Sequence, residues 1–229
     1  YWLTPWPQGE LIIVDFSAGA GGDVLQIGDA LSSLSGSFGY DAAANPFASG
    51  YLRLFEEASA EGVDTLLQIT YDPSWPSWQT LVRLKNVASA ALTQENFGPQ
   101  VNPTGGETSP VSYAGTSADE TVFGSIVADT IDGGGGYYDE LYGYGGDDTI
   151  VLNGSSDPYN TWSNGVVNGG PGDDTLSAGY ATGYPSLNGD EGNDTITGAE
   201  GQDYINGGAG SDLIHGGGGD DSNYDYRDP

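Results

Sequence analysis

Hydrophobic and polar positions follow two different periods along this chain, and the period changes near its middle. In the first half, apolar and β-branched residues form short runs between turn-forming residues, at 51–55, 63–70 and 79–87. Such runs are typical of strands joined in an antiparallel meander. Residues 11–16 predict a further strand, Asp29 is a candidate cap for a short helix, and residues 89–97 carry a weak helical pattern. We therefore expect a mainly antiparallel β domain with short helices.

In the second half, a nine-residue phrase recurs with glycine at positions one and four, aspartate at position six and an aliphatic residue at position eight. Repeats begin at Gly115, Gly124, Gly134, Gly143, Gly169, Gly189, Gly198, Gly207 and Gly216, with Gly133 as a single inserted residue. The eighth position is filled by Val122, Ile131, Leu141, Ile150, Leu176, Ile196, Ile205 and Ile214, and by Val167 and Leu187 in two irregular units with expanded turns. One inward aliphatic side chain per repeat cannot form a core alone, so the units must stack.

The two halves are joined by residues 98–115, which are rich in Pro, Gly, Ser and Thr and cannot sustain a helix or a central strand. We expect a linker or a surface crossover there, and two domains comprising residues 1–110 and 111–229. The chain contains no Met and starts at Tyr1, which indicates a piece of a longer polypeptide.

The charge balance narrows the range of partners. The 229 residues include 33 acidic and 4 basic ones, a formal net charge of −29. This sign excludes nucleic acid and disfavours anionic membrane surfaces. No stretch is apolar over the roughly 18 residues that a membrane-spanning helix needs, and the lack of Cys excludes disulfides and thiolate metal sites. A disordered acidic tail does not fit 37% hydrophobic and 11% aromatic residues, so something outside the sequence must neutralise the charge.

The carboxylates at position six of the repeats indicate what that neutralising partner is. They belong to Asp129, Asp139, Asp148, Asp174, Asp194, Asp203, Asp212 and Asp221. Stacked at the strand spacing of about 4.8 Å, these groups would repel one another. Calcium removes the conflict, because it takes about six to eight oxygen ligands and a turn of glycine carbonyls and aspartate offers only oxygens. Zinc or iron would require His or Cys, and the chain has one His and no Cys.

The repeated phrase resembles the RTX (repeats-in-toxin) calcium-binding nonapeptide over residues 115 to about 224. This resemblance implies an all-β fold, a parallel β-roll in which six residues of each repeat form a turn and three form a strand. It also implies several calcium ions, each held between turns two repeats apart by position-six carboxylates and by backbone carbonyls. The candidate carbonyl ligands are those of Gly189, Glu191, Asn193, Gly198, Glu200, Gly207, Ala209 and Gly216.

Alternation of the turns would sort the acidic residues onto two edges of such a roll. A continuous edge would carry Asp129, Asp148, Asp174, Asp194 and Asp212, and an interrupted edge would carry Glu120, Asp139, the two expanded turns, Asp203 and Asp221. The pattern is not kept everywhere, because Val127 and Tyr137 occupy the fourth position where glycine is expected.

The first half has a resemblance of its own. The segments VDFSAGAGGDVLQIGD, NPFASGYLRLFEE, DTLLQITYD, WQTLVRLKNV and LTQENF are similar, in this order, to the C-terminal target region of bacterial type I secreted RTX proteins. The resemblance covers roughly residues 10–98 and implies a role in export.

No catalytic arrangement emerges from the sequence, which lacks a nucleophile elbow, a His-Glu-x-x-His motif and a phosphate-binding loop. Asp15, Asp23 and Asp29 are further candidate calcium ligands that caps and turns explain equally well, and His215 falls on an outward strand position. We expect a non-enzymatic, calcium-binding structural or adhesive module of a type I secreted bacterial surface or filament protein, which folds on calcium binding after export. Its partners would be calcium ions, and copies of itself or surface glycans.

Two alternatives stay open from the sequence. The chain could be the carrier region of a secreted hydrolase whose catalytic domain lies outside these residues. It could also be a carbohydrate-binding module that uses the tyrosines near the irregular repeats and Trp162.

Overall fold

The computed structural model describes residues 11–38, 40–42, 44–106, 108–154 and 164–226. The chain divides into two compact units, Tyr1–Thr108 and Ser109–Pro229, called unit 1 and unit 2 below. Both consist mostly of strands, and the predicted all-β class is confirmed. None of the helices among the described residues has the length and apolar character needed to cross a membrane.

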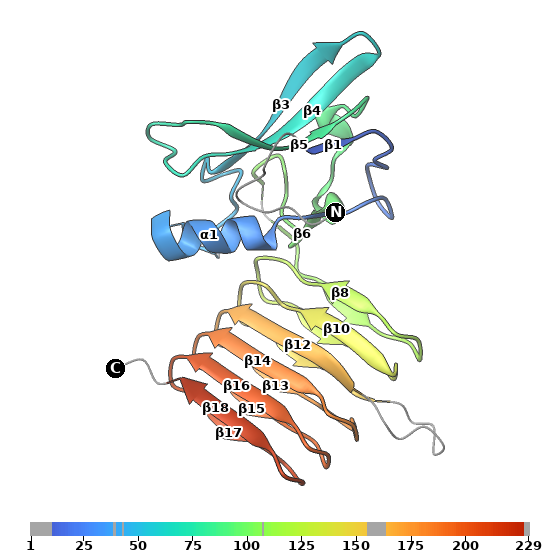
Figure 1. Ribbon diagram of the computed structural model, residues 1–229, viewed down its shortest axis with the longest axis vertical. Coiled ribbons are helices and arrows are strands. Elements are labelled where there is room, and N and C mark those ends of the chain that lie inside the picture. The colour runs from blue at the N-terminus through green and yellow to red at the C-terminus, as the bar shows by residue number, and fades with distance from the viewer. Residues whose placement is uncertain (1–10, 39, 43, 107, 155–163, 227–229) are drawn as a thin grey trace. The chain divides into compact units, whose positions relative to one another are not determined.

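Unit 1 contains a four-stranded sheet in the order β1-β5-β4-β3 (Figure 1). Strands β3 (Leu52–Ser59), β4 (Gly62–Ile69) and β5 (Gln79–Leu84) pair antiparallel, as the hydrophobic runs predict, and β1 (Leu11–Ile13) pairs parallel with β5. A second, short parallel pair joins β2 (Leu25–Gln26) to β6 (Phe97–Gly98).

Helical structure in unit 1 is short. Helix α1 (Gly28–Phe38) begins one residue before Asp29, which therefore lies in the first helical turn rather than at the predicted cap position. The weak helical pattern at residues 89–97 corresponds to two 3₁₀ turns, η1 (Ser89–Ala91) and η2 (Gln94–Asn96).

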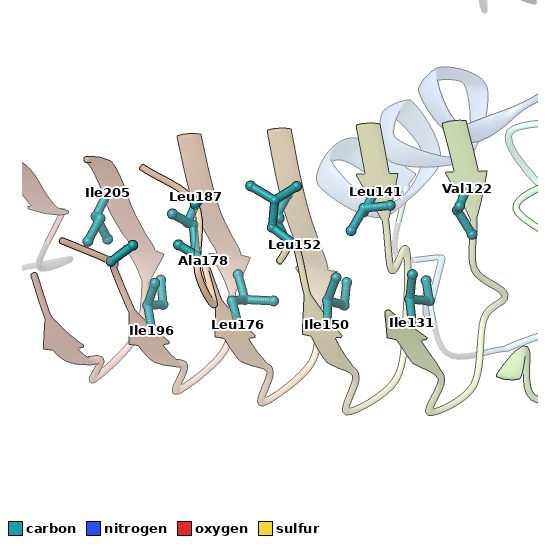
Figure 2. Packing of buried hydrophobic residues seen from close by; sticks show 13 residues of the cluster. Val122, Ile131, Leu141, Ile150, Leu152, Leu176, Ala178, Leu187, Ile196 and Ile205 are labelled. Atoms are coloured by element: carbon teal, nitrogen blue, oxygen red, sulfur yellow. The ribbon is translucent and has the colours of Figure 1, made fainter. Parts of the chain in front are cut away.

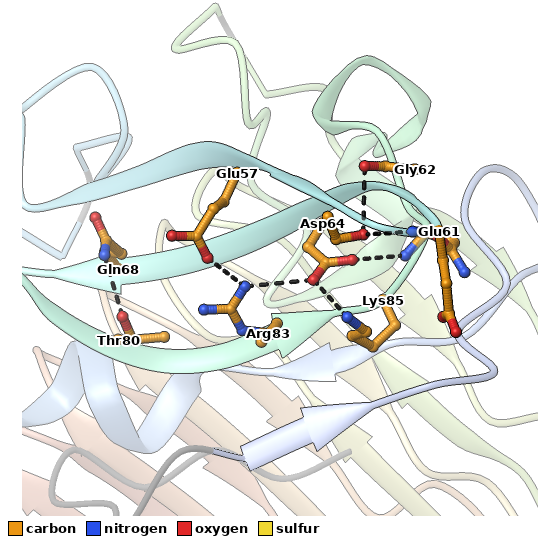
Figure 3. A network of polar contacts seen from close by, with 10 residues as sticks. Glu57, Glu61, Gly62, Asp64, Gln68, Thr80, Arg83 and Lys85 are labelled. Carbon is orange, nitrogen blue, oxygen red and sulfur yellow. Dashed lines mark hydrogen bonds and ion pairs between the residues drawn. The ribbon is translucent and has the colours of Figure 1, made fainter.

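A buried carboxylate lies on the sheet of unit 1 (Figure 3). Asp64 on β4 is 1% exposed, and its Oδ2 accepts a hydrogen bond from Lys85 Nζ at 2.8 Å and from Arg83 Nη1 at 3.3 Å. Arg83 also pairs with Glu57 on β3. The hydrogen bond from Lys85 contributes most to lowering the pKa of Asp64 to about 2. Two of the few cations of the chain are thus engaged in holding unit 1 together.

Unit 2 is built from two six-stranded parallel sheets, and successive strands of the chain enter them alternately (Figure 1). One sheet contains β7 (Ser112–Ala114), β9 (Thr130–Asp132), β11 (Thr149–Val151), β13 (Thr175–Ser177), β15 (Thr195–Thr197) and β17 (Leu213–His215). The other contains β8 (Thr121–Phe123), β10 (Tyr138–Tyr142), β12 (Asn164–Pro171), β14 (Ser186–Glu191), β16 (Tyr204–Ala209) and β18 (Ser222–Tyr226). Each turn therefore stacks on the turn two repeats away, which is the arrangement of a β-roll.

The eighth position of each repeat supplies the core of the roll (Figure 2). Because neighbouring side chains on a strand point to opposite faces, a three-residue strand directs only its middle residue inward. Residues at this position are at most 6% exposed from Val122 to Ile205, and Ile214, near the end of the roll, packs against the cluster while partly buried. Leu152, Ala178 and Ala181, which the repeat pattern does not assign, complete the core.

Two local features differ from the sequence expectation. Strand β7 begins at Ser112, inside the segment expected to be a linker, and pairs with β9 as the first strand of its sheet. Gly133 stands at position one of its repeat rather than outside it. Its N–H donates to the carbonyl of Val151 at 2.8 Å, and this is the same bond that Gly143, at position one of the next repeat, makes with the carbonyl of Asn168. The extra residue therefore lies within the turn, and the strand register is preserved.

Candidate metal-binding edges of the β-roll

The continuous edge of the roll carries a ladder of aspartates. At each rung the backbone N–H of one aspartate donates to Oδ1 of the aspartate two repeats later. The donor–acceptor distances are 2.8 Å for Asp129 to Asp148, 2.8 Å for Asp148 to Asp174, 2.9 Å for Asp174 to Asp194 and 2.9 Å for Asp194 to Asp212. One oxygen of each of the four acceptors is thereby fixed, and the carboxylates are held in line along the edge.

The second carboxylate oxygen of these residues is left without a partner. Oδ2 is inaccessible to solvent and accepts no hydrogen bond in Asp148, Asp174, Asp194 and Asp212. The first three side chains are each 1% exposed. Burial, followed by the neighbouring carboxylates, raises the pKa of Asp148 and of Asp174 to about 8 and that of Asp194 to about 6. A row of buried carboxylate oxygens without hydrogen-bond donors is the arrangement that a hard cation would satisfy.

At glycine positions of these turns, carboxylate and carbonyl oxygens occupy the space that a Cβ atom would need. A Cβ on Gly169, at position one, would lie 2.1 Å from Oδ2 of Asp174. A Cβ on Gly192, at position four with φ +145°, would lie 1.8 Å from the carbonyl oxygen of Gly172 in the stacked turn. Glycine is required here both by the positive φ and by the close approach of carbonyl and carboxylate oxygens.

A second ladder, at position five, lies beside the first and runs in the opposite sense. Oδ1 of Asp147 accepts from the N–H of Asp173 at 3.0 Å, Oδ1 of Asp173 from the N–H of Asn193 at 2.7 Å, and Oδ1 of Asn193 from the N–H of Ser211 at 3.1 Å. The residues of this ladder were not predicted from the sequence. The recurrence of Asp or Asn at position five was the available signal, and each turn is consequently tied to both of its neighbours.

The interrupted edge has two short aspartate ladders. Glu120 N–H donates to Oδ1 of Asp139 at 2.9 Å, and Asp203 N–H donates to Oδ1 of Asp221 at 3.1 Å. Between them, the strand register puts Gly165 beside Asp139 and Pro185 beside Asp203, so neither intervening rung has an acidic residue at position six.

Pro185 also changes the environment of the following rung. Proline has no N–H to donate, and Oδ1 of Asp203 is accordingly buried without a hydrogen-bond partner. Burial raises the pKa of Asp203 to about 6. Trp162 and most of the first expanded turn lie outside the described residues.

The candidate carbonyl ligands lie in the same stacked turns. The carbonyl of Glu191 accepts from Gly172 N–H at 2.8 Å, and that of Ala209 accepts from Gly192 N–H at 2.9 Å. A carbonyl oxygen has two lone pairs, so these bonds leave each atom able to bind a cation as well. The remaining candidates belong to the turns at residues 189–194, 198–203, 207–212 and 216–221.

The candidate ligands of unit 1 do not form a comparable arrangement. Oδ2 of Asp23 accepts from Ser17 N–H at 2.7 Å and closes a local turn, Asp29 lies in α1, and Asp15 is exposed. Within the described part of the chain, no three or more His, Cys, Asp or Glu side chains converge on one point. An ion bound at the edges of the roll would therefore need backbone carbonyl oxygens as ligands in addition to carboxylates. This donor set suits calcium and not zinc.

The comparisons with known proteins agree with this donor set. The model of the RTX calcium-binding nonapeptide repeat matches four copies in this chain, at residues 114–136, 159–180 and 188–222, all within unit 2. RTX nonapeptide repeats bind several calcium ions per array, and the match supports an RTX calcium-binding repeat protein. A search of curated proteins found no match, and a search of solved structures found none.

Proposed function

We propose that unit 2 is a non-enzymatic structural module that folds when calcium ions bind between the stacked turns of its edges. The observation that carries this proposal is the row of buried, unpartnered Oδ2 atoms on the continuous edge, at Asp148, Asp174, Asp194 and Asp212. The interrupted edge adds Asp203 with its unpartnered Oδ1, and Asp139 and Asp221 at position six.

The chain's own residues explain why folding would depend on the ion. The hydrogen bonds of the ladder satisfy only one oxygen of each carboxylate, and no Lys or Arg occurs between residues 115 and 224 to pair with the other. Bound calcium would supply the positive charge and would be coordinated by the carboxylate oxygens that the ladder leaves without a partner. Without it, the folded state buries like charges side by side, and the unfolded chain, in which they are hydrated and far apart, is favoured.

Dependence on calcium links folding to location. Weak extracellular calcium sites work at about 10⁻⁴ to 10⁻³ M, far above the concentration inside a cell. We propose that the chain leaves the bacterial cell unfolded by type I secretion and closes into the roll outside, where ion binding supplies the folding free energy. RTX repeat proteins are typically secreted by bacteria, which supports an extracellular site of action.

The surface of the roll supports a structural or adhesive role rather than catalysis. The roll offers repeated turns and exposed tyrosines, such as Tyr180 at 83% and Tyr184 at 55% exposure, for contacts with another copy or with surface glycans. Unit 1, by its sequence resemblance, is proposed to take part in export.

Calcium titration of the metal-free chain tests the proposal. We expect far-UV circular dichroism in EDTA to show loss of the strands of unit 2 and added calcium to restore them, whereas magnesium at equal concentration does not. Asp174→Asn should lower the number of bound ions, and Asp173→Asn, which changes the exposed neighbouring residue, should leave that number unchanged. A full set of native strands in EDTA at pH 7, or equal ion counts for the two variants, would overturn the proposal.

A further inference from the structure

One rung of the continuous edge differs from the others in how its aspartate is satisfied. In the turn at residues 124–129, called the Ser125 turn below, Oδ1 of Asp129 lies 2.9 Å from the hydroxyl of Ser125 and accepts from the N–H of Val111 at 2.6 Å. Oδ2 of Asp129 accepts from the N–H of Ser125. Both oxygens are therefore engaged by the protein, although Asp129 is only 3% exposed and Ser125 is fully buried. At the other rungs of this edge, Oδ2 has no partner.

The backbone of the Ser125 turn is also different. At the other rungs of the continuous edge, position four is a glycine with φ of +100° to +146°, at Gly146, Gly172, Gly192 and Gly210. Val127 occupies this position in the Ser125 turn and does not have a positive φ. The hydroxyl of Ser125 accepts from the N–H of Val127 at 3.2 Å and lies 3.1 Å from its carbonyl oxygen. The serine side chain thus fills the interior of the turn, where the glycine turns gather oxygens.

A related turn opens the interrupted edge. Among the regular repeats, position two is Ser or Thr only at Thr116 and Ser125, in the first turn of each edge. The N–H and the hydroxyl of Thr116 both donate to Oε1 of Glu120. Oε2 of Glu120 nevertheless keeps no partner, so of these two turns the Ser125 turn alone satisfies its carboxylate completely.

We infer that the Ser125 turn holds no calcium ion, and that Ser125 occupies the place of the ion and closes the first rung of the continuous ladder without metal. This inference rests on the proposed function, because it states which turns of the calcium-binding edge are occupied. Ser125 is a positioning residue that determines ion occupancy. The rung at Asp129 then forms a metal-independent end on which the calcium-dependent rungs from Asp148 to Asp212 stack.

Ion counting by native mass spectrometry of the full chain in calcium tests the inference. Asp129→Asn should leave the number of bound calcium ions at the wild-type value, whereas Asp174→Asn, at an equally buried rung of the same ladder, should reduce it. The double substitution Ser125→Gly/Val127→Gly converts the turn from GSIVAD to GGIGAD, so that it has glycine at positions one, two and four like the turns that begin at Gly169 and Gly207. We expect this variant to bind one ion more than the wild type, and Asp129→Asn in the same background to remove it.

The outcomes separate the inference from the proposal beneath it. Circular dichroism in calcium confirms that each variant is folded before ions are counted. If Asp129→Asn lowers the count, or the double variant gains no ion, the Ser125 turn is an ordinary calcium site or cannot become one, and the inference is wrong while the proposed function stands. A wild-type chain that binds no calcium would overturn the proposed function itself.

Discussion

Without metal, the β-roll should be more stable in acid than at neutral pH. Burial raises the pKa of Asp148 and of Asp174 from 3.8 to about 8 in the folded roll. In the unfolded chain both groups regain their ordinary pKa. A carboxyl group whose pKa is raised by folding contributes no penalty below about pH 4, and it destabilises the folded state increasingly as the pH rises from there towards 8.

The size of this effect follows from the two pKa values. At pH 7 the solution lies about 3 pH units above the unfolded pKa, and each unit corresponds to about 1.4 kcal/mol, so each residue destabilises the metal-free roll by about 4 kcal/mol. The two residues together remove about 8 kcal/mol, which is comparable with the whole stability of a typical domain, about 5–15 kcal/mol. Asp194 and Asp203, with pKa values raised to about 6, act in the same direction.

The assay is far-UV circular dichroism of the metal-free chain between pH 4.5 and pH 8, with denaturant unfolding at each pH at which the metal-free roll is folded. Asp148 and Asp174 alone should lower the free energy of unfolding by about 3 kcal/mol per pH unit between about pH 5 and 7, because the folded state holds two more protons on these groups than the unfolded state does. Asp148→Asn/Asp174→Asn is the matched control, and its metal-free form should lose most of this slope. A metal-free roll that is as stable at pH 7 as at pH 4.5, or an unchanged slope in the control, would refute the reasoning.

Three further predictions concern packing and charge. Ile150→Ala, in the core of the roll, should lower the free energy of unfolding in calcium by about 2–5 kcal/mol, whereas Tyr180→Ala at an exposed position should change it by less than about 0.5 kcal/mol, as measured by denaturant titration. Gly192→Ala should lower the melting temperature, because its φ is +145° and its Cβ would meet a carbonyl at 1.8 Å; Gly135→Ala, with its nearest atom at 3.5 Å, should not. Asp64→Asn should destabilise unit 1 at neutral pH and remove the loss of stability that the wild type shows as the pH falls from about 4 towards 2, which thermal melts across that range would reveal.

The sequence predicted the parts of the roll that depend on periodicity. The aliphatic residue at position eight recurs because each repeat contributes one inward side chain, and all such positions from Val122 to Ile205 are buried. The aspartates at position six stack in register because each repeat places its turn at the same position relative to its strand. Unit 1 was less predictable: its antiparallel strands follow from apolar runs, whereas the parallel pairing of β1 with β5 brings together segments about 70 residues apart, which no local pattern encodes.

What the sequence did not reveal depends on hydrogen bonds between turns. Asp173 and Asn193 at position five look like solvent-exposed polar residues, and their ladder becomes visible only when the turn two repeats away is in place. Ser125 likewise stands at position two, where the repeat pattern specifies no residue type. Its effect on Asp129 arises from the fold of a single turn, in which one hydroxyl reaches a carboxylate four positions later. The period of the repeat indicates which turns stack on one another, but it does not indicate which hydrogen bonds each carboxylate accepts.

The parallel ladders of unit 2 also determine how the roll would respond to mechanical tension. Its strands lie across the direction in which the repeats stack, so their hydrogen bonds point along that direction. A pull along the stacking direction loads the rungs in series, and the weakest rung sets the breaking force. The rungs at Gly165 and Pro185 have no aspartate to bridge them on the interrupted edge, so the roll would first extend there. On the continuous edge, the aspartate ladder would still connect the turns on either side of these rungs.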